Sequence, residues 1–348
     1  MAFRESVERW LREPEPPGLG IEFRADEVVL ARLNVKYGGQ PNLDLCVRAP
    51  FPSGERLEFS TLSPNLKDLS AMRRHLSTVF RQAGISGQRI ALTLPDSLAR
   101  IWLQHLSGAP RGKAEVEELL RFKLKKTLPF DVEEARLSFE RVGGPPSTPT
   151  FLTGIMQEQV VSQYEELLEG LGFHVGAIET CSMSLIKLWS AVARKDLPAE
   201  ADYFFVNIEE DYFTMSLVRK GEVPALVRTL RQRTPGSEEP PPPPDEDGGL
   251  PEPRSDGRYT TDDLLRELLP TLIYYREKLN GTALARVYYR SLRDDLHDIG
   301  GVLEAQFKVP AEPFDLTRAV SIGRSLQMDE PLADLVGAAA GAAAGRAA

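Results

Sequence analysis

The chain has 348 residues, of which 42% are hydrophobic and 27% charged, a composition typical of globular proteins. This length allows two domains of roughly 100–200 residues each. The net charge of −9 gives no overall positive field, which argues against binding to DNA or RNA. The two cysteines, Cys46 and Cys181, are far apart in sequence and lie in no CxxC motif, so we expect neither a disulfide framework nor a metal site.

The sequence predicts a cytoplasmic protein. It contains no apolar run of the roughly 20 residues that a membrane-spanning helix needs. The first residues, MAFRESVERW, lack the apolar centre of a secretion signal. We therefore expect any contact with a membrane to be indirect, through partner proteins.

Residues 1–17 form a separate N-terminal segment. Phe3, Val7, Trp10 and Leu11 recur at helical spacing and predict one apolar stripe on a short amphipathic helix, which the prolines up to Pro17 end. Acidic and basic residues alternate in this segment, which favours packing on the protein itself or on a partner over binding to a membrane surface.

Residues 18–88 predict a first α/β domain. Short apolar runs separated by turn residues are typical of strands, and a longer run with a period of 3.6 is typical of a helix. The expected strands are Gly18–Phe23, Val28–Val35, Leu43–Val47 and a fourth around Leu57–Phe59, followed by a helix over Leu66–Ala83.

Residues 89–180 predict an inserted subdomain. The expected strands are Arg89–Leu94, Leu98–His105, Ala135–Val142, Phe151–Met156 and Val175–Glu179, and the expected helices are Ala114–Thr127 and Gln157–Leu171. The order β-α-β-β-α-β within this range is that of a ferredoxin-like unit.

Residues 181–230 predict a joining helix and the start of a second α/β domain. The helix is expected over Ser182–Val192, and strands over Tyr203–Ile208, Phe213–Arg219 and Val223–Leu230. Residues 231–257 are acidic and contain the run Pro240–Pro244, which predicts a disordered, exposed linker. A proline-rich ligand for a partner is the alternative reading of this run.

Residues 258–337 predict the rest of the second domain. A helix is expected over Tyr259–Leu279, a strand over Ala285–Tyr289, mostly helix over Arg290–Ala305 and an edge segment over Glu312–Leu316. The Ala/Gly tail, residues 338–348, predicts a helix of small residues whose end frays.

Three segments of the chain resemble a known family. They are ALTLPDSLARIWLQHL, AEVEELLRFKLKKTLPFDVEEARLSFE and ADYFFVNIEEDYFTMSLVRKGEVPALVRTLR. They resemble the PilM family, the actin-like cytoplasmic proteins of the type IV pilus inner-membrane complex, and the likeness extends at pattern level from Gly18 to about Gly337. It implies a two-domain actin-like (ribonuclease-H-like) α/β fold with an inserted ferredoxin-like subdomain.

The resemblance also locates the loops that hold ATP in such folds, and all three are altered here. Where the family has G-L-D-I-G, the chain has Gly20 at the acidic position and Glu22 at the turn glycine. Where the family has V-D-I-G-A, the chain has Asn207 and Glu209. Tyr288 and Tyr289 stand at the place of the glycine-rich adenosine loop, and Gly300-Gly301 is expected to follow a helix and not to replace that loop.

These replacements predict a pseudo-ATPase without ATP, Mg²⁺ or another cofactor. Phosphate must approach backbone N–H groups closely, so small residues are needed where Glu22 and Glu209 stand. Two like charges 4 Å apart repel by about 4 kcal/mol at an effective dielectric constant near 20. The two tyrosines are expected to fill the slot for the base and ribose.

With catalysis absent, the resemblance implies an assembly adaptor. PilM-like proteins bind the short cytoplasmic tail of PilN, a membrane protein, in a groove between the first domain and the inserted subdomain. We therefore expect a PilN-like bitopic partner, with pilus motor ATPase components as further partners. The candidate contact residues are Arg121, Phe122, Lys126, Leu128, Pro129 and Phe130, with packing in the core as the alternative role of the apolar ones.

Two other functions stay open at this stage. One is a working actin-like ATPase that binds Mg-ATP through unusual residues. The other is the cytoplasmic part of a GspL-like platform protein of type II secretion, although such proteins normally continue into a membrane-spanning helix.

Overall fold

The computed structural model describes residues 17–34, 40–52, 55–108, 110, 112–219, 224–233, 254–256, 260–293, 295–296, 298–324, 326 and 336–344. The predicted N-terminal amphipathic helix and the proline run of the predicted linker lie outside these ranges. Among the described residues, no helix is both long and apolar enough to cross a bilayer.

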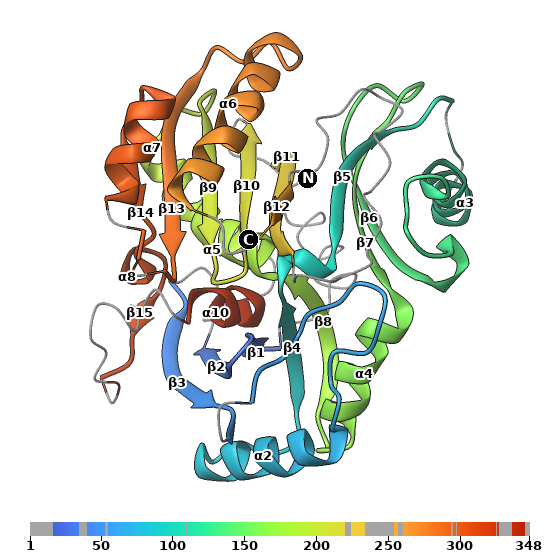
Figure 1. Cartoon of the computed structure of the whole chain (residues 1–348), viewed down its shortest axis with the longest axis vertical. Coiled ribbons are helices and arrows are strands. Elements are labelled where there is room, and N and C mark those ends of the chain that lie inside the picture. The colour runs from blue at the N-terminus through green and yellow to red at the C-terminus, as the bar shows by residue number, and fades with distance from the viewer. Residues whose placement is uncertain are drawn as a thin grey trace, which may run out of the picture.

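The first half of the molecule is built on a six-stranded sheet of order β15-β3-β2-β1-β4-β8 (Figure 1). Its central strand β1 pairs antiparallel with β2 and parallel with β4, and β4 pairs parallel with β8. The strands are β1 (Leu19–Phe23), β2 (Glu27–Asn34), β3 (Asn42–Pro50), β4 (Arg89–Leu94), β8 (His174–Thr180) and β15 (Ser321–Ile322).

The second half repeats this plan in a sheet of order β12-β11-β10-β9-β13-β14. Its central strand β9 again pairs antiparallel with the next strand of the chain and parallel with the strand that follows the first helix. The strands are β9 (Asp202–Ile208), β10 (Tyr212–Arg219), β11 (Pro224–Arg233), β12 (Arg254–Asp256), β13 (Leu284–Ser291) and β14 (Ala311–Pro313). The two-domain α/β fold expected from the sequence is therefore confirmed.

Helices cover the outer face of each sheet. Asp68 caps α2 by accepting from the backbone N–H of Ala71, and a capping box of Thr260 and Asp263 starts α6. Side chains of α2 and α4 share one core with the first sheet, and those of α6 and α7 share another with the second sheet. The bounds are α2 (Leu69–Gln82), α4 (Glu158–Glu169), α6 (Thr261–Glu277) and α7 (Ile299–Phe307).

Two helices lie between the sheets and join the halves through a single core. They are α5 (Cys181–Asp196) and α10 (Gly337–Ala344), and the short helix α8 (Leu316–Ala319) adjoins them. The expected helix of small residues is confirmed as α10, and all eight of its residues are buried. The end of the tail, for which fraying was expected, lies outside the described residues. Small residues allow the helix backbone to approach its neighbours, because a Cβ on Gly341 would lie 2.2 Å from the carbonyl oxygen of Ser184.

The inserted subdomain is smaller than the range 89–180 that the sequence suggests. Its sheet has the order β5-β7-β6, and one helix covers one of its faces. The elements are β5 (Arg100–His105), α3 (Lys113–Leu124), β6 (Ala135–Gly143) and β7 (Thr150–Gln157), with short 3-10 turns at Asp96–Leu98 and Val132–Glu134. The strands at 89–94 and 174–180 are β4 and β8 of the first domain, because their apolar runs pair with each other and, through β4, with β1. The complete ferredoxin-like unit is therefore not formed.

Three further expectations differ from the structure. The segment around Leu57–Phe59 forms no strand, although Leu57 is buried in the first core. Residues 290–291 still belong to β13, and the helix expected over Arg290–Ala305 starts at Ile299. Within the predicted linker 231–257, residues 231–233 and 254–256 form paired parallel strands.

Candidate functional site

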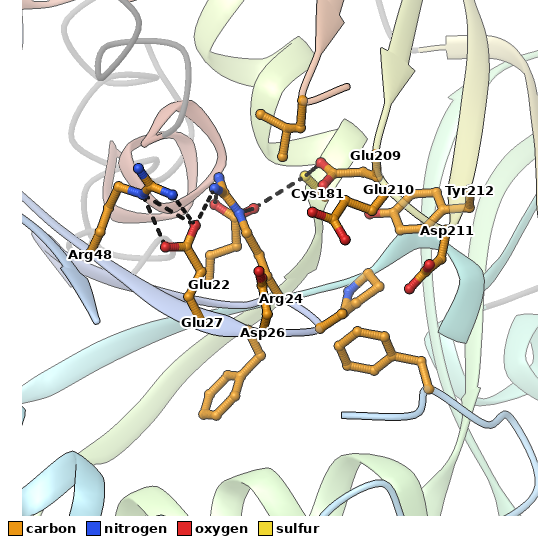
Figure 2. Close-up of a pocket in the computed structure, with 15 residues that line it drawn as sticks. Glu22, Arg24, Asp26, Glu27, Arg48, Cys181, Glu209, Glu210, Asp211 and Tyr212 are labelled. Carbon is orange, nitrogen blue, oxygen red and sulfur yellow. Dashed lines mark hydrogen bonds and ion pairs between the residues drawn. The ribbon is translucent and has the colours of Figure 1, made fainter. Parts of the chain in front are cut away.

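The turns that follow β1 and β9 face each other between the two halves. Figure 2 shows the residues around this point, which we call the central cleft. It is lined by residues of both turns and by the start of α5, and its cavity volume is about 100 Å³. Pockets for small molecules and cofactors usually measure about 300–1,000 Å³. The cavity of the central cleft is smaller than this range.

Arg24 fills the first-domain side of the central cleft. Its Nε lies 2.8 Å from Oε1 of Glu22, and its Nη1 lies 2.9 Å from Oε1 of Glu27. Arg48 approaches Glu27 from the other side, with Nε 3.0 Å from Oε2 (Figure 2). Burial alone would lower the pKa of the Arg24 guanidinium, but Glu22 and Glu209 more than offset it and hold this pKa above its ordinary value. Arg24 therefore stays charged.

Arg290, on β13, fills the second-domain side. Its side chain has no exposed surface, and its Nη1 donates to Oε1 of Glu209 at 2.5 Å and to Oδ1 of Asn207 at 3.1 Å. Its Nη2 lies 3.8 Å from Oε1 of Glu22, so this guanidinium bridges the two domains. Burial opposes its charge, but Glu209 and the neighbouring acids raise its pKa above the ordinary value.

Glu209 stays ionised although it is buried. Burial acts to raise its pKa, but Arg290, Arg24 and a hydrogen bond from Cys181 outweigh burial and lower it. The Cys181 Sγ donates to Oε1 of Glu209 at 3.3 Å. Burial, reinforced by Glu209 and Glu22, raises the pKa of this thiol well above its ordinary value, so it remains protonated.

An ion-pair network runs through the central cleft. Three carboxylates and three guanidinium groups make it up: Glu22, Glu27, Glu209, Arg24, Arg48 and Arg290. Three further acids, Asp26, Glu210 and Asp211, also line the cleft, and Arg56 pairs with the last two. Glu22 and Glu209 are therefore paired with arginines, which the sequence pattern did not indicate, and the exclusion of a triphosphate stays a prediction.

One buried group of residues has the donor types of a metal site. Oxygen atoms of Glu22 and Glu209 and the sulfur of Cys181 all lie within 4.8 Å of one another. A metal ion there would have to displace Arg290 and Arg24 from the same carboxylates and deprotonate a thiol whose pKa is raised. The residues present therefore fit internal ion pairs better than Mg²⁺ or another cation.

Asp96 forms a second buried link next to the central cleft. It follows β4 and accepts hydrogen bonds from the backbone N–H of Ser182, at 2.8 Å, and from the Ser182 hydroxyl. Thr214 of β10 also donates to it, which connects it to the second domain. Burial raises the pKa of the Asp96 carboxyl, although these hydrogen bonds act to lower it.

Gly20 has a packing role in the structure. A Cβ at this position would lie 2.0 Å from the carbonyl oxygen of Ala339, because α10 crosses β1 here. An aspartate, which the family has at the matching position, cannot fit beside this helix. Gly20 is therefore needed for the buried α10.

Tyr288 and Tyr289, which were expected in the adenosine slot, lie on strand β13 and do not line the central cleft. Tyr288 packs between the sheets, with its ring centroid 5.3 Å from that of Trp189 and 5.4 Å from that of Tyr203. Tyr289 lies against Gly300, where a Cβ would come within 2.6 Å of the tyrosine oxygen.

Gly300 and Gly301 are placed differently from the sequence expectation that they follow a helix. They form the first turn of α7, and the described residues between β13 and α7 contain no helix. Asp298 caps this turn by accepting from the backbone N–H of Gly301, and a Cβ on Gly301 would lie 2.6 Å from the Asp298 carboxylate. Both glycines are therefore required by close contacts with neighbouring side chains.

A second and much larger cavity lies between the inserted subdomain and the first domain. Its volume is about 770 Å³, and we call it the insert groove. One wall is the face of the insert sheet that carries Leu152 and Gly154, and the opposite wall is formed by β8 and α5. Apolar side chains from both walls line it: Ile101, Val142, Leu152, Met156, Ile178, Met183 and Ile186. A groove between these two parts was expected from the family resemblance, but these lining residues were not among the predicted contact residues.

The predicted partner-binding residues lie on the other side of the insert. On β7, Phe151 packs with α3, whereas Gly154 lines the insert groove. Arg121 donates to the carbonyl oxygens of Val132 and Ala135 and so braces α3. The remaining candidates do not line the groove either: Phe122 is 81% exposed, Leu128 and Phe130 pack in the insert core, Pro129 is half-buried and Lys126 is exposed.

Comparison with known proteins gives structural matches alone. No protein-family model matches the chain, and no curated protein matches it in sequence. The solved "PilM-PilN type IV pilus biogenesis complex" matches with a TM-score of 0.70 at 16% identity, over 96% of this chain and 98% of that one. The cytoplasmic domain of EpsL, an inner-membrane component of the Vibrio cholerae type II secretion system, matches at a TM-score of 0.45 and 8% identity, over 92% and 93% of the two chains.

A Bacteroides thetaiotaomicron protein of unknown function with an actin-like ATPase fold matches at a TM-score of 0.47 and 11% identity, over 87% of this chain and 91% of that one. The first match spans nearly the whole of both chains, and the strand order of one domain is repeated in the other. The chain therefore has a two-domain actin-like α/β fold.

Proposed function

We propose that this protein is a non-catalytic assembly adaptor that captures an extended segment of a partner protein in the insert groove. The observation that carries this proposal is the contrast in volume between the two cavities. The central cleft holds about 100 Å³, whereas the insert groove holds about 770 Å³ and falls within the usual range for ligand sites.

The absence of catalysis is supported by what fills the central cleft. Arg24 and Arg290 satisfy the carboxylates that face each other across the two domains. The protonated Cys181 donates to one of these carboxylates, so it offers no free thiolate. The contacts of Arg290 with Glu22 and Glu209 also bridge the two halves.

The insert groove has the features of a peptide site. It is mainly apolar, with a few charged groups on its walls, among them Arg194 and the ion pair of Lys187 with Glu179. β6 ends the order of the insert sheet and β8 ends that of the first sheet, and both strands contribute residues to the groove. Within the described residues, neither edge pairs with a further strand. An extended peptide can add to such an edge through its backbone and place alternate side chains in the apolar groove.

The partner that fits best is the cytoplasmic tail of a bitopic membrane protein, as in the PilM–PilN complex whose fold this chain shares. In this role the protein would work in the cytoplasm at the inner membrane, held there by its partner, in a type IV pilus or a related secretion platform. Motor ATPase components are the further partners we propose. A small bitopic protein and a pilus motor encoded next to this chain would favour the pilus over type II secretion.

Gly154 offers a direct test of this site. A Cβ at Gly154 would meet nothing within 4 Å, so Gly154→Phe places a ring in the insert groove without disturbing the fold. Lys126→Phe is the matched control, because Lys126 is exposed on the α3 side of the insert and does not line the groove. We expect Gly154→Phe to weaken binding of the bitopic tail peptide at least tenfold in calorimetry and Lys126→Phe to leave it unchanged.

A second pair of variants separates the two faces of the insert. Phe130→Ala with Lys126→Glu alters the α3 side alone. Loss of peptide binding in this variant, together with full binding by Gly154→Phe, would move the site to α3 and refute the groove as the binding site.

A further inference from the structure

We propose that α6 is a self-association surface through which two copies of this chain pair antiparallel about a two-fold axis near Leu269. Among the described residues, three large apolar side chains are largely exposed: Phe122, Leu269 and Ile273. Two of these three lie four residues apart on α6, so they share one face of this helix.

The exposed face of α6 is a continuous stripe. Its exposed residues recur at alternating steps of four and three positions: Asp262, Arg266, Leu269, Ile273 and Arg276. This spacing of 3.5 residues keeps a seam in register with a second helix. The opposite face, which includes Leu264, Leu268 and Leu272, packs on the second sheet. In Figure 1, α6 lies on the outside of the second domain, away from the insert.

The charges on the stripe identify a second copy as the occupant. Asp262 and Arg276 are each seven residues from Leu269, one towards each end of the helix. Antiparallel pairing about Leu269 places Asp262 of each copy opposite Arg276 of the other. One Asp–Arg ion pair then lies at each end of the seam. The same operation places Leu269 opposite Leu269, and Ile273 opposite Leu265, which is half-buried against the second-domain core. Arg266 of the stripe already pairs with Asp263 of its own helix, at 3.4 Å. Neither Asp262 nor Arg276 forms an ion pair with another described residue, so both are available to a partner.

The size of the seam predicts a weak dimer. One helix face buries far less than the roughly 1,200–2,000 Å² of a stable interface. We therefore expect an exchanging monomer–dimer equilibrium that dilution shifts to the monomer. The stripe lies on the second domain and the insert groove on the first, so dimerisation leaves the proposed peptide site free and presents two such sites in one particle.

Sedimentation equilibrium of the full chain over a wide concentration range tests this proposal. We expect the average mass of the wild type to rise towards that of a dimer and Leu269→Glu/Ile273→Glu to remain monomeric. Asp262→Arg alone places like charges across both ends of the seam and is expected to weaken association roughly tenfold. The double exchange Asp262→Arg/Arg276→Asp is expected to restore association to the wild-type level.

Phe122→Ser is the matched control, because it removes the third exposed apolar side chain and lies on α3. It is expected to leave association unchanged. The substituted side chains are exposed, and an unchanged melting temperature verifies that each variant is folded. A wild type that stays monomeric, a mass increase that survives Leu269→Glu/Ile273→Glu, or a charge exchange that fails to restore pairing would each refute the proposal.

Discussion

The central cleft and the insert groove both lie between separate layers of this molecule, and they differ in the side chains that line them. In the cleft, charged side chains from both domains form ion pairs with one another and leave about 100 Å³. In the groove, apolar side chains from both walls line a cavity of about 770 Å³. Charges that are removed from water need partners of opposite charge, whereas an apolar wall can stay open until a ligand binds.

This contrast is the basis of the proposal that a partner binds in the insert groove. In the cleft, the contacts of Arg290 with Glu22 and Glu209 join the two domains. A groove flanked by two open strand edges holds unused hydrogen-bonding groups together with unused apolar surface. The four experiments below test this contrast, from the largest expected effect to the smallest.

The largest expected effect comes from alanine at Gly20, where α10 crosses β1, compared with alanine at Gly154 in the insert groove. Gly20→Ala places a Cβ 2.0 Å from the carbonyl oxygen of Ala339, which belongs to the backbone of a buried helix. We expect a loss of about 4 kcal/mol or more in the free energy of unfolding, because neither α10 nor β1 can move freely. Gly154→Ala, in the open groove, is expected to change it by less than about 1 kcal/mol. Urea denaturation measures both, and equal losses would contradict the packing described for α10.

The ion pairs of the cleft can be separated from those at its rim. Glu209→Gln leaves the fully buried Arg290 without its closest anion, at 2.5 Å. We expect this to cost about 3–5 kcal/mol, as for other broken buried pairs. Glu210→Gln removes a partly exposed pair with Arg56, at 2.8 Å, and is expected to cost less than about 1 kcal/mol. Thermal unfolding of the two variants would refute the network as a structural bridge if Glu209→Gln were as stable as Glu210→Gln.

Asp96 predicts a pH dependence of stability. Burial raises the pKa of its carboxyl above the ordinary value of 3.8, so the folded protein holds this proton more tightly than the unfolded chain. Its contribution to stability is therefore present at low pH and is lost as the pH rises through the folded pKa. From about pH 4 to about pH 7, the wild type is expected to lose stability relative to Asp96→Asn by about 1.4 kcal/mol for each unit between the two pKa values.

Ser182→Ala sharpens this measurement. The Ser182 hydroxyl donates to Asp96 and acts to lower its pKa, so its removal is expected to steepen the loss of stability with rising pH. Guanidinium denaturation at several pH values compares the three proteins. A stability difference between wild type and Asp96→Asn that does not vary with pH would exclude a raised pKa at Asp96.

The smallest expected effect is that of Mg-ATP on the melting temperature. A ligand at a hundred times its dissociation constant adds about 2.7 kcal/mol to the folded state. Because the central cleft is filled, we expect no change with Mg-ATP, whereas a peptide bound in the insert groove is expected to raise the melting temperature. A saturable rise with Mg-ATP would favour a working ATPase and overturn the proposed loss of catalysis.

Much of the element content follows from local pattern. The apolar run Arg89–Leu94 is β4 with the same bounds as expected, and the helix expected over Ala114–Thr127 is α3 at Lys113–Leu124. Such elements depend on periodicity and capping, which are properties of neighbouring residues. The helix expected from Arg290 onwards starts only at Ile299, because the polar residues between β13 and α7 belong to the connection between these elements.

The candidate site was predicted in part. The sequence placed Glu22 and Glu209 at corresponding turns of the two domains, and in the structure both lie at the central cleft. Arg24 and Arg290 were not predicted there, although buried acids need counter-charges and arginine is the residue best suited to supply them.

The sequence by itself determined the two α/β domains and the acidic residues at the turns after their first strands. The tertiary structure alone decided that α10 lies buried on Gly20, that Arg24 and Arg290 pair with Glu22 and Glu209, and that the open groove lies across the insert sheet from α3. Periodicity and turn chemistry act between residues close in the chain. Burial, charge compensation and cavity shape depend on residues that only the folded chain brings together.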